Sequence, residues 1–174
     1  PMIRPLLLLA LVPGIASAQM PGEAVPEDAA VRAEAAMTEF AQTLRTTLTD
    51  TIARDGVVAA IAVCAKEAPA IAANVGQAHG VRIGRTSHRA RNPANVPDHW
   101  QRSALERFSL SVAQGRRPET LNHRAVELGR AQFARGIPVE AACLACHGPK
   151  ESLAEGVAEA LAKQYPLDQA TGFQ

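Results

Sequence analysis

The sequence predicts an α+β domain in which helices flank a small antiparallel sheet. Two stretches before residue 80 place apolar residues at steps of three and four, as amphipathic helices do. Apolar and polar residues alternate around Gly129, which is typical of two paired strands. A short helical stretch then carries Cys143-Leu144-Ala145-Cys146-His147. We therefore expect a long N-terminal helix, a central hairpin and a cysteine-bearing helix near the C-terminal end.

The composition fits one compact domain with no affinity for nucleic acid. The chain has 174 residues, of which 47% are hydrophobic and 20% charged, as in single globular domains. Only 3% are aromatic, so the core is expected to consist of aliphatic residues, and a surface for stacking nucleic-acid bases is not expected. Trp100 is the one tryptophan.

Residues 1–18 have the pattern of a secretory signal peptide. Arg4 precedes the apolar run 6–12, which is too short to span a membrane, and the small residues 16–18 follow it. Cleavage near Ala18 would leave a periplasmic protein with no membrane span and nearly equal numbers of basic and acidic residues. Residues 19–27 are expected to be a linker, and residues 28–174 a single domain.

The first half of this domain is predicted to be mostly helical. Apolar residues of the first helix share one face, and Asp55-Gly56 ends it: Met37, Phe40, Leu44, Leu48 and Ile52. The next helical stretch places Cys64 on its inward face, so we expect a buried thiol. Pro69 predicts a kink or restart just beyond it.

The second half is predicted to mix strands and helices. Residues 81–83 alternate like a short strand, and residues 85–97 form a polar loop. Asp98 is a candidate cap for a helix that ends at Gly115. Strand residues Val126 and Leu128 precede Gly129, and Ala131 and Phe133 follow it. After the cysteine-bearing helix, a last amphipathic helix carries Leu153, Val157 and Leu161.

The run Cys143-Leu144-Ala145-Cys146-His147 is the attachment signature of c-type haem. One helical turn places two thiols where they can form thioethers with the two vinyl groups of the porphyrin, and His147 then offers an imidazole to the iron. An export signal agrees with this interpretation, because c-type haem is attached outside the cytoplasm. The expected cofactor is therefore one covalently bound haem c.

Two other interpretations use the same thiols. A redox-active disulfide would usually open a helix within a thioredoxin-like pattern, which the preceding sequence lacks. A zinc-stabilised interaction domain would combine Cys64 with Cys143, Cys146 and His147 as four ligands. The zinc interpretation is the more serious rival, although Cys64 stands apart from the other three in the sequence.

The second axial position on the iron would decide what the domain does. Cys64 is one candidate, since it is the leftover thiol of an odd set of three, but it is equally well explained as a small buried side chain. The other candidates are ordinary loop or core residues as well: Met37, His79, His88, His99 and His123. A thiolate on ferric iron would lower the reduction potential.

Several segments together resemble a known family: Val63-Cys64, Arg85-Thr86-Ser87, residues 91–97, Trp100, Leu105, Phe108, residues 143–148 and residues 165–168. They resemble periplasmic haem-c domains with a PAS-like fold, long known only as a domain of unknown function, and the match runs from about Met37 to the end. The resemblance implies haem c on Cys143 and Cys146, with His147 and Cys64 as axial ligands. It also implies redox or small-gas sensing without an enzymatic reaction. The family usually continues into a further turn and strand, so the last strand is expected to be missing here.

Arg85 and Arg91 lie in the resembling loop and are candidates to pair with the haem propionates, since guanidinium groups match carboxylates bidentately. A solvated loop is the plainer alternative. The leading expectation for function is a haem sensor that binds NO or CO when Cys64 leaves the iron. A periplasmic electron carrier, six-coordinate in both redox states, is the alternative. Either one requires a partner protein that the sequence does not identify.

Overall fold

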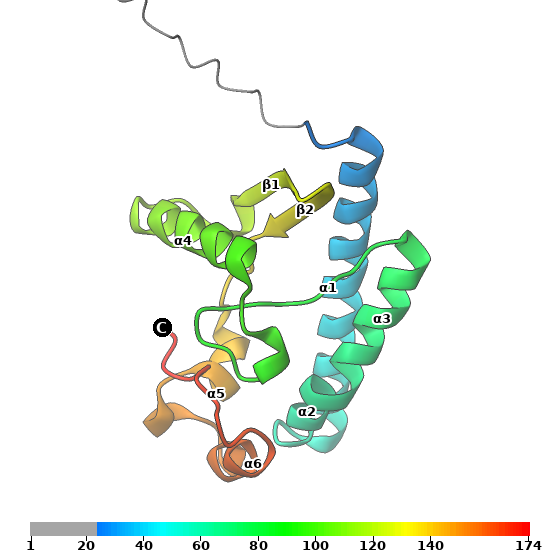
Figure 1. The fold of residues 1–174 in the computed structure, drawn as a ribbon. Helices are drawn as coiled ribbons and strands as arrows, with labels where there is room; N and C mark the ends of the chain where they lie inside the picture. Colours follow the sequence, from blue (N-terminus) through cyan, green and yellow to red (C-terminus); the bar gives the residue numbers. More distant parts are fainter. Residues whose placement is uncertain (1–23) are drawn as a thin grey trace, which may run out of the picture.

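The computed structural model describes residues 24–174 (Figure 1). The expected signal peptide and most of the expected linker therefore lie outside the described residues. Within residues 24–174, no helix combines the length and apolar character that a membrane span requires.

A helical hairpin forms one side of the molecule (Figure 1). The long helix α1 ends at Gly56, as expected, and the chain returns along it as a nearly continuous helical segment. The elements of this hairpin are α1 (Glu27–Asp55), α2 (Ala59–Ala62), the π turn η1 (Val63–Glu67) and α3 (Ala68–His79).

The face that α1 buries is richer in alanine than expected. Phe40 and Leu44 are buried, as predicted, but Ile52 is exposed. Small side chains at Ala33 and Ala36 share the buried face, which allows neighbouring elements to approach α1 closely. The first apolar cluster of the molecule forms between α1 and α3: Ala36, Phe40, Leu44, Val63, Ala68 and Val75, with Leu48, Ile71, Ala72, Val81 and Ile83 packed against it.

Cys64 lies in the π turn η1, immediately before the helix restarts at Ala68 with Pro69 in its first turn. This restart confirms the predicted break near Pro69. The predicted burial of Cys64 is wrong, because its side chain is only half-buried. The wider π turn changes which residues face inward, and Val63, 2% exposed, takes the buried position instead.

Residues 81–83 form no strand, contrary to expectation. Val81 and Ile83 pack against the first apolar cluster, and no neighbouring segment within residues 24–174 pairs with them. The Val81 amide instead donates to the carbonyl of Gly76. The chain then crosses to α4 (His99–Ala113), where Asp98 and Gln101 form a reciprocal capping box that confirms the predicted helix start.

The predicted hairpin is confirmed, with a turn one residue earlier than expected. Strands β1 (Asn122–Glu127) and β2 (Arg130–Arg135) pair in antiparallel register, with Glu127 opposite Arg130. Leu128 was expected in the first strand but occupies the turn with Gly129, and both residues have positive φ. Positive φ at both central positions is typical of the two-residue type I′ turn, whose twist matches that of the strands.

The C-terminal part gathers around a second apolar cluster. Its short elements are η4 (Ala141–Cys143), α5 (Leu144–His147), η5 (Lys150–Ser152) and α6 (Val157–Gln164). Leu153 was expected within the last helix but precedes it. The cluster contains Ile61, Val157, Leu161 and Tyr165, with Val57, Ala65, Cys146, Leu153, Ala154 and Ala160 packed against it.

The α+β class and the helix-flanked antiparallel sheet are confirmed by this architecture. The sheet of residues 24–174 has two strands, and β2 contacts α1. Whether the domain is PAS-like stays a prediction. Helices α5 and α6 lie at the opposite end of the molecule from the start of α1, and the end of the chain lies beside α5 (Figure 1).

Candidate functional site

The cysteine-bearing segment folds as a turn of 3₁₀ helix followed by one α-helical turn, as the sequence predicted. Cys143 ends the first and Cys146 lies in the second, and Gly148 ends the helical turn with its amide donating to the carbonyl of Leu144. No disulfide joins any of the three cysteines, Cys64, Cys143 and Cys146. Cys146 packs against the second apolar cluster, and burial raises the pKa of its thiol above the ordinary value.

His147 is held in a defined orientation by the C-terminal end of the chain. Its Nδ1 lies 2.7 Å from the carbonyl oxygen of Ala170. Since a carbonyl can only accept, Nδ1 carries the proton and donates, and Nε2 keeps its lone pair. Burial, reinforced by the positive charge of Arg91, lowers the pKa of His147, so the imidazole is neutral at physiological pH. A neutral imidazole with a free Nε2 is a strong ligand for a transition metal.

Arg91 links three segments around the motif. Its Nε donates to the carboxylate of Asp168 at 3.1 Å, and one terminal nitrogen donates to the carbonyl oxygens of Cys146 and Ala170 at 2.6 and 3.2 Å. The Arg91 and Asp168 side chains are 10% and 11% exposed. Asp168 also accepts from the amide of Ala170. This network fixes the residue whose carbonyl orients His147.

Residues 168–173, here called the C-terminal strap, lie along the motif helix. The amides of Gly172 and Phe173 donate to the carbonyls of Gly148 and His147, at 2.7 and 2.9 Å. The Phe173 ring meets the His147 ring edge-on, with 6.1 Å between centroids. Arg89 lies 4.1 Å above the Phe173 ring and donates to two carbonyls of the strap. The strap therefore covers one side of the motif.

Cys64 lies in the neighbourhood of the motif, although the sequence separates them by about eighty residues. Its charge acts on both the Cys146 thiol and the Tyr165 hydroxyl, and the adjacent Ala65 packs in the same cluster as Cys146. Burial, followed by the Cys64 charge, raises the pKa of Tyr165. The fold therefore brings Cys64 into the neighbourhood of Cys146 and Tyr165.

The two candidate arginines occupy different positions. Arg85 is half-buried, makes no hydrogen bond or ion pair within residues 24–174, and acts electrostatically on both His147 and Tyr165. Arg91 already pairs with Asp168 and with carbonyls of the motif. The pairing of either arginine with a haem propionate stays a prediction.

Comparison with known proteins identifies the family. The sequence model of the Tll0287-like family matches residues 23–174. The chain belongs to this family. Among solved structures, the crystal structure of the cyanobacterial haem protein Tll0287 is similar, with a TM-score of 0.63 and 24% identity over 87% of this chain and 89% of that one. No curated protein matches.

In this member of the Tll0287-like family, three of the other candidate axial ligands have partners elsewhere in the fold. His79 contacts Glu39 on α1 at 2.7 Å, and His123 stacks on Trp100. The His99 side chain is 91% exposed beside Glu127. His88 lies in an exposed part of the loop that follows α3, and Met37 lies on α1.

The geometry disfavours a structural zinc site. Within residues 24–174, no three His, Cys, Asp or Glu side chains gather closely enough to hold a metal ion together. A zinc ion bound by Cys64, Cys143, Cys146 and His147 would require such a group.

Sequence reasoning missed the residues that support the motif from outside. Asp168 lies within a segment that resembles the family, but its role required the knowledge that it faces Arg91. Phe173 carried no local signal, and Arg89 stood out only as one charge of the basic run in the polar loop. All three act through contacts across more than twenty residues of chain, which neither periodicity nor motif spacing reveals.

Proposed function

We propose that this chain is an exported, single-haem c-type cytochrome domain that senses redox state or a small gas such as NO or CO. Cys143 and Cys146 hold the haem through thioethers, and His147 and Cys64 are its axial ligands. When bound, haem c supplies one-electron exchange between ferric and ferrous iron. The chain itself contributes the residues that orient these ligands. We assign no enzymatic step to them.

The observation that carries the proposal is the hydrogen bond between His147 Nδ1 and the Ala170 carbonyl. Ligating histidines commonly donate their second ring nitrogen to a carbonyl or carboxylate, which fixes the tautomer and the plane of the ring. His147 has this arrangement, with its Nδ1 2.7 Å from the carbonyl oxygen of Ala170. Arg91 and the backbone bonds of the C-terminal strap then hold Ala170 in place. A surface histidine after a chance Cys-x-x-Cys would need none of this support.

The position of Cys64 supports its assignment as the second ligand. It lies in a π turn, a rare backbone element that is frequent at functional sites. Its side chain is half-buried rather than enclosed in the core, so the sulfur is partly accessible. A thiolate stabilises ferric iron, and its release on reduction would open a position for a gas molecule.

Membership of the Tll0287-like family supports haem as the cofactor, because the cyanobacterial protein Tll0287 is a haem protein. The features that make the haem covalent are carried by this chain itself, in the two thiols and the histidine of the motif. The same thiols and an expected signal peptide favour export, where haem attachment takes place.

Attachment is tested by expressing the full chain with a haem-attachment system and recording a pyridine haemochrome spectrum under denaturing conditions. A c-type spectrum, with haem that stays on the denatured polypeptide, is expected. The Cys143→Ala, Cys146→Ala double variant should lose it. A colourless matured protein, with both thiols free or bridged to each other, overturns the proposal.

Axial ligation is tested on the same material with Cys64→Ala and with His79→Gln as a matched control. We expect Cys64→Ala to change the ferric low-spin spectrum and to raise the reduction potential, whereas His79→Gln leaves both unchanged. An unchanged spectrum in Cys64→Ala eliminates the thiolate. If wild-type ferrous protein binds CO, Cys64 is labile and the sensor is supported; if only Cys64→Ala binds CO, electron transfer is the function.

A further inference from the structure

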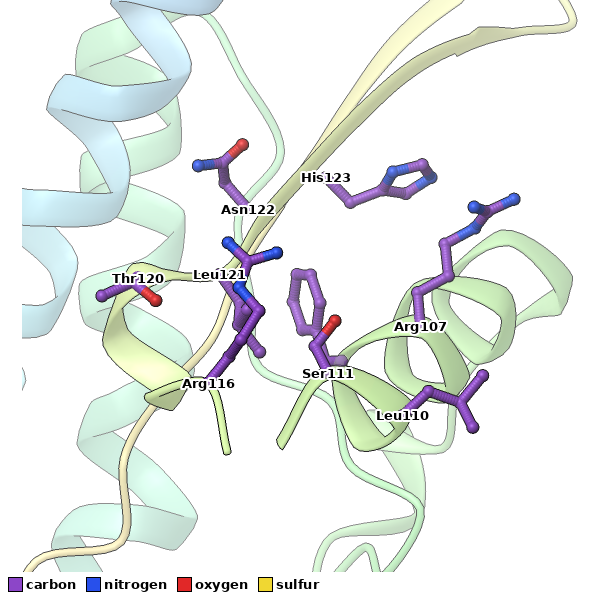
Figure 2. Close-up of a pocket in the computed structure, with 9 residues that line it drawn as sticks. Arg107, Leu110, Ser111, Arg116, Thr120, Leu121, Asn122 and His123 are labelled. Atoms are coloured by element: carbon purple, nitrogen blue, oxygen red, sulfur yellow. The ribbon is translucent and has the colours of Figure 1, made fainter. Parts of the chain in front are cut away.

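A cleft of about 480 Å³ lies between α4 and the start of β1 (Figure 2), and we call it the α4–β1 cleft. None of Cys64, Cys143, Cys146 and His147 lines it, so it is separate from the proposed haem site. Its volume is within the range of clefts that bind small molecules. The expected functions of the domain assign no role to it.

Two arginines dominate the charge of the α4–β1 cleft. Arg107 comes from α4 and Arg116 from the turn that follows, and Figure 2 shows them on either side of Ser111. Within residues 24–174, neither arginine makes an ion pair or a side-chain hydrogen bond, and no acidic residue lines the cleft. The nearby Glu119 lies 3.4 Å from Arg117 instead. The cleft thus holds uncompensated positive charge.

The position of Arg116 is fixed by the end of α4. Gly115 has a φ of 86°, and the amide of Arg116 donates to the carbonyl of Ser111 at 3.0 Å. This pattern closes a helix with a left-handed glycine and reverses the chain direction. The reversal brings Arg116 back over the last turn of the helix, to the side of the cleft opposite Arg107.

The remaining lining of the cleft combines an apolar surface with hydrogen-bonding groups. Phe108 is half-buried and offers apolar surface, and the buried Leu121, 3% exposed, packs behind it in the wall of the cleft. Ser111 and Asn122 add uncharged polar groups. His123 stacks on the buried Trp100 at 5.5 Å, which holds its ring at the edge of the cleft beside Arg107 (Figure 2). Two guanidinium groups beside an apolar surface suit a ligand that has both a charged and an apolar part.

We propose that the α4–β1 cleft binds a small organic carboxylate. The carboxylate pairs with the guanidinium groups of Arg107 and Arg116, and the apolar body of the ligand lies on the exposed part of Phe108. Guanidinium is the side-chain group that best matches a carboxylate, because its parallel N–H groups donate to both oxygens. The site gives the domain a second, haem-independent ligand.

Isothermal titration calorimetry of the full matured protein tests the site with three probes at constant ionic strength. Benzoate carries both a carboxylate and an apolar body, benzamide has the same shape without the charge, and inorganic phosphate has the charge without the apolar body. We expect benzoate to bind at one site with a dissociation constant of about 1 mM or tighter, and the other two at least about tenfold more weakly.

Variants locate the binding. Arg107→Gln and Arg116→Gln should each weaken benzoate binding about tenfold, since each removes a charge-assisted hydrogen bond. Arg130→Gln is the matched control, because Arg130 is also exposed and lies beyond the turn of the hairpin, outside the cleft. In wild type, benzoate should also raise the pH at which the ring protons of His123 titrate in NMR spectra.

Three results would overturn the proposal: no heat from benzoate, equal affinity for benzoate and either of the other probes, or benzoate binding that both cleft variants retain. Circular dichroism of each variant checks that the fold is intact. Because both arginines are exposed and lack partners in the described structure, their replacement is not expected to disturb folding.

Discussion

The Arg91 guanidinium lies 3.1 Å from the Asp168 carboxylate, and both side chains are about nine-tenths buried. The two residues are 77 positions apart, so this ion pair joins the loop after α3 to the C-terminal strap. The same guanidinium reaches the carbonyl of Cys146, in the motif itself. One side chain therefore connects the loop, the motif helix and the strap that orients His147.

Asp168→Asn should destabilise the protein by about 3 kcal/mol, because it leaves the buried Arg91 charge without its counter-ion. Urea unfolding followed by circular dichroism measures the loss. Glu140→Gln is the control: Glu140 makes a two-bond ion pair with Arg45 at comparable distances, but that pair is exposed, and little change is expected. A loss in Asp168→Asn no greater than in the control would contradict a structural role for the buried pair.

The raised pKa of Cys146 predicts slow alkylation in protein prepared without haem attachment. Only the thiolate reacts, and burial keeps the Cys146 thiol protonated to higher pH than in the unfolded chain. The rate of reaction with iodoacetamide, read by peptide mass spectrometry, should therefore reach half its maximum at higher pH in buffer than in urea. The same midpoint in both solvents would show that Cys146 is not buried.

His123 should make the fold less stable in mildly acidic solution. Burial, followed by the positive charge of Arg107, lowers its pKa below the ordinary value of about 6.5. Near this pH the unfolded chain binds the proton more readily than the folded one. The contribution of neutral His123 to the free energy of unfolding is therefore complete above about pH 6.5 and falls as the pH drops below it. His123→Gln should reduce this part of the pH dependence of the unfolding free energy. An unchanged pH profile in His123→Gln would refute the assignment.

The hairpin turn offers a stabilising substitution. Leu128 has a φ of 52° and is 96% exposed, so it bears the steric cost of the left-handed region without gaining any burial. Asparagine tolerates this conformation and is favoured before glycine in type I′ turns, so Leu128→Asn should stabilise the protein by about 1 kcal/mol. The control is Leu167→Asn, at another exposed leucine that is not among the positive-φ residues. An equal gain in both variants would mean that the backbone is not the cause.

Local patterns were sufficient to predict the elements whose signals lie within a few residues. The end of α1 at Gly56, the cap of α4 at Asp98 and the hairpin around Gly129 all depend on neighbouring side chains and backbone freedom. The helical turn that carries Cys146 and His147 belongs to the same group. In each case the local preference and the tertiary fold agree.

Features that depend on distant partners could not be predicted in the same way. Residues 81–83 have the alternation of a strand, but no neighbouring strand pairs with them, and their apolar side chains pack on helices instead. The π turn at Cys64 moves the buried position to Val63 without any change in the apolar pattern. The contacts of Asp168 and Phe173 with the motif depend on how the strap returns to it, and no short motif encodes that path.

The division of the interior into two apolar clusters has a consequence for how the motif can be exposed. The buried residues of the cluster around Cys146 come from α2, α6 and Tyr165, with none from α1, whose own packing belongs to the other cluster. Local opening of the C-terminal part would therefore release only a few buried side chains and the hydrogen bonds of residues 168–173. A modifying enzyme could reach both thiols of the motif while the long helical hairpin stays folded.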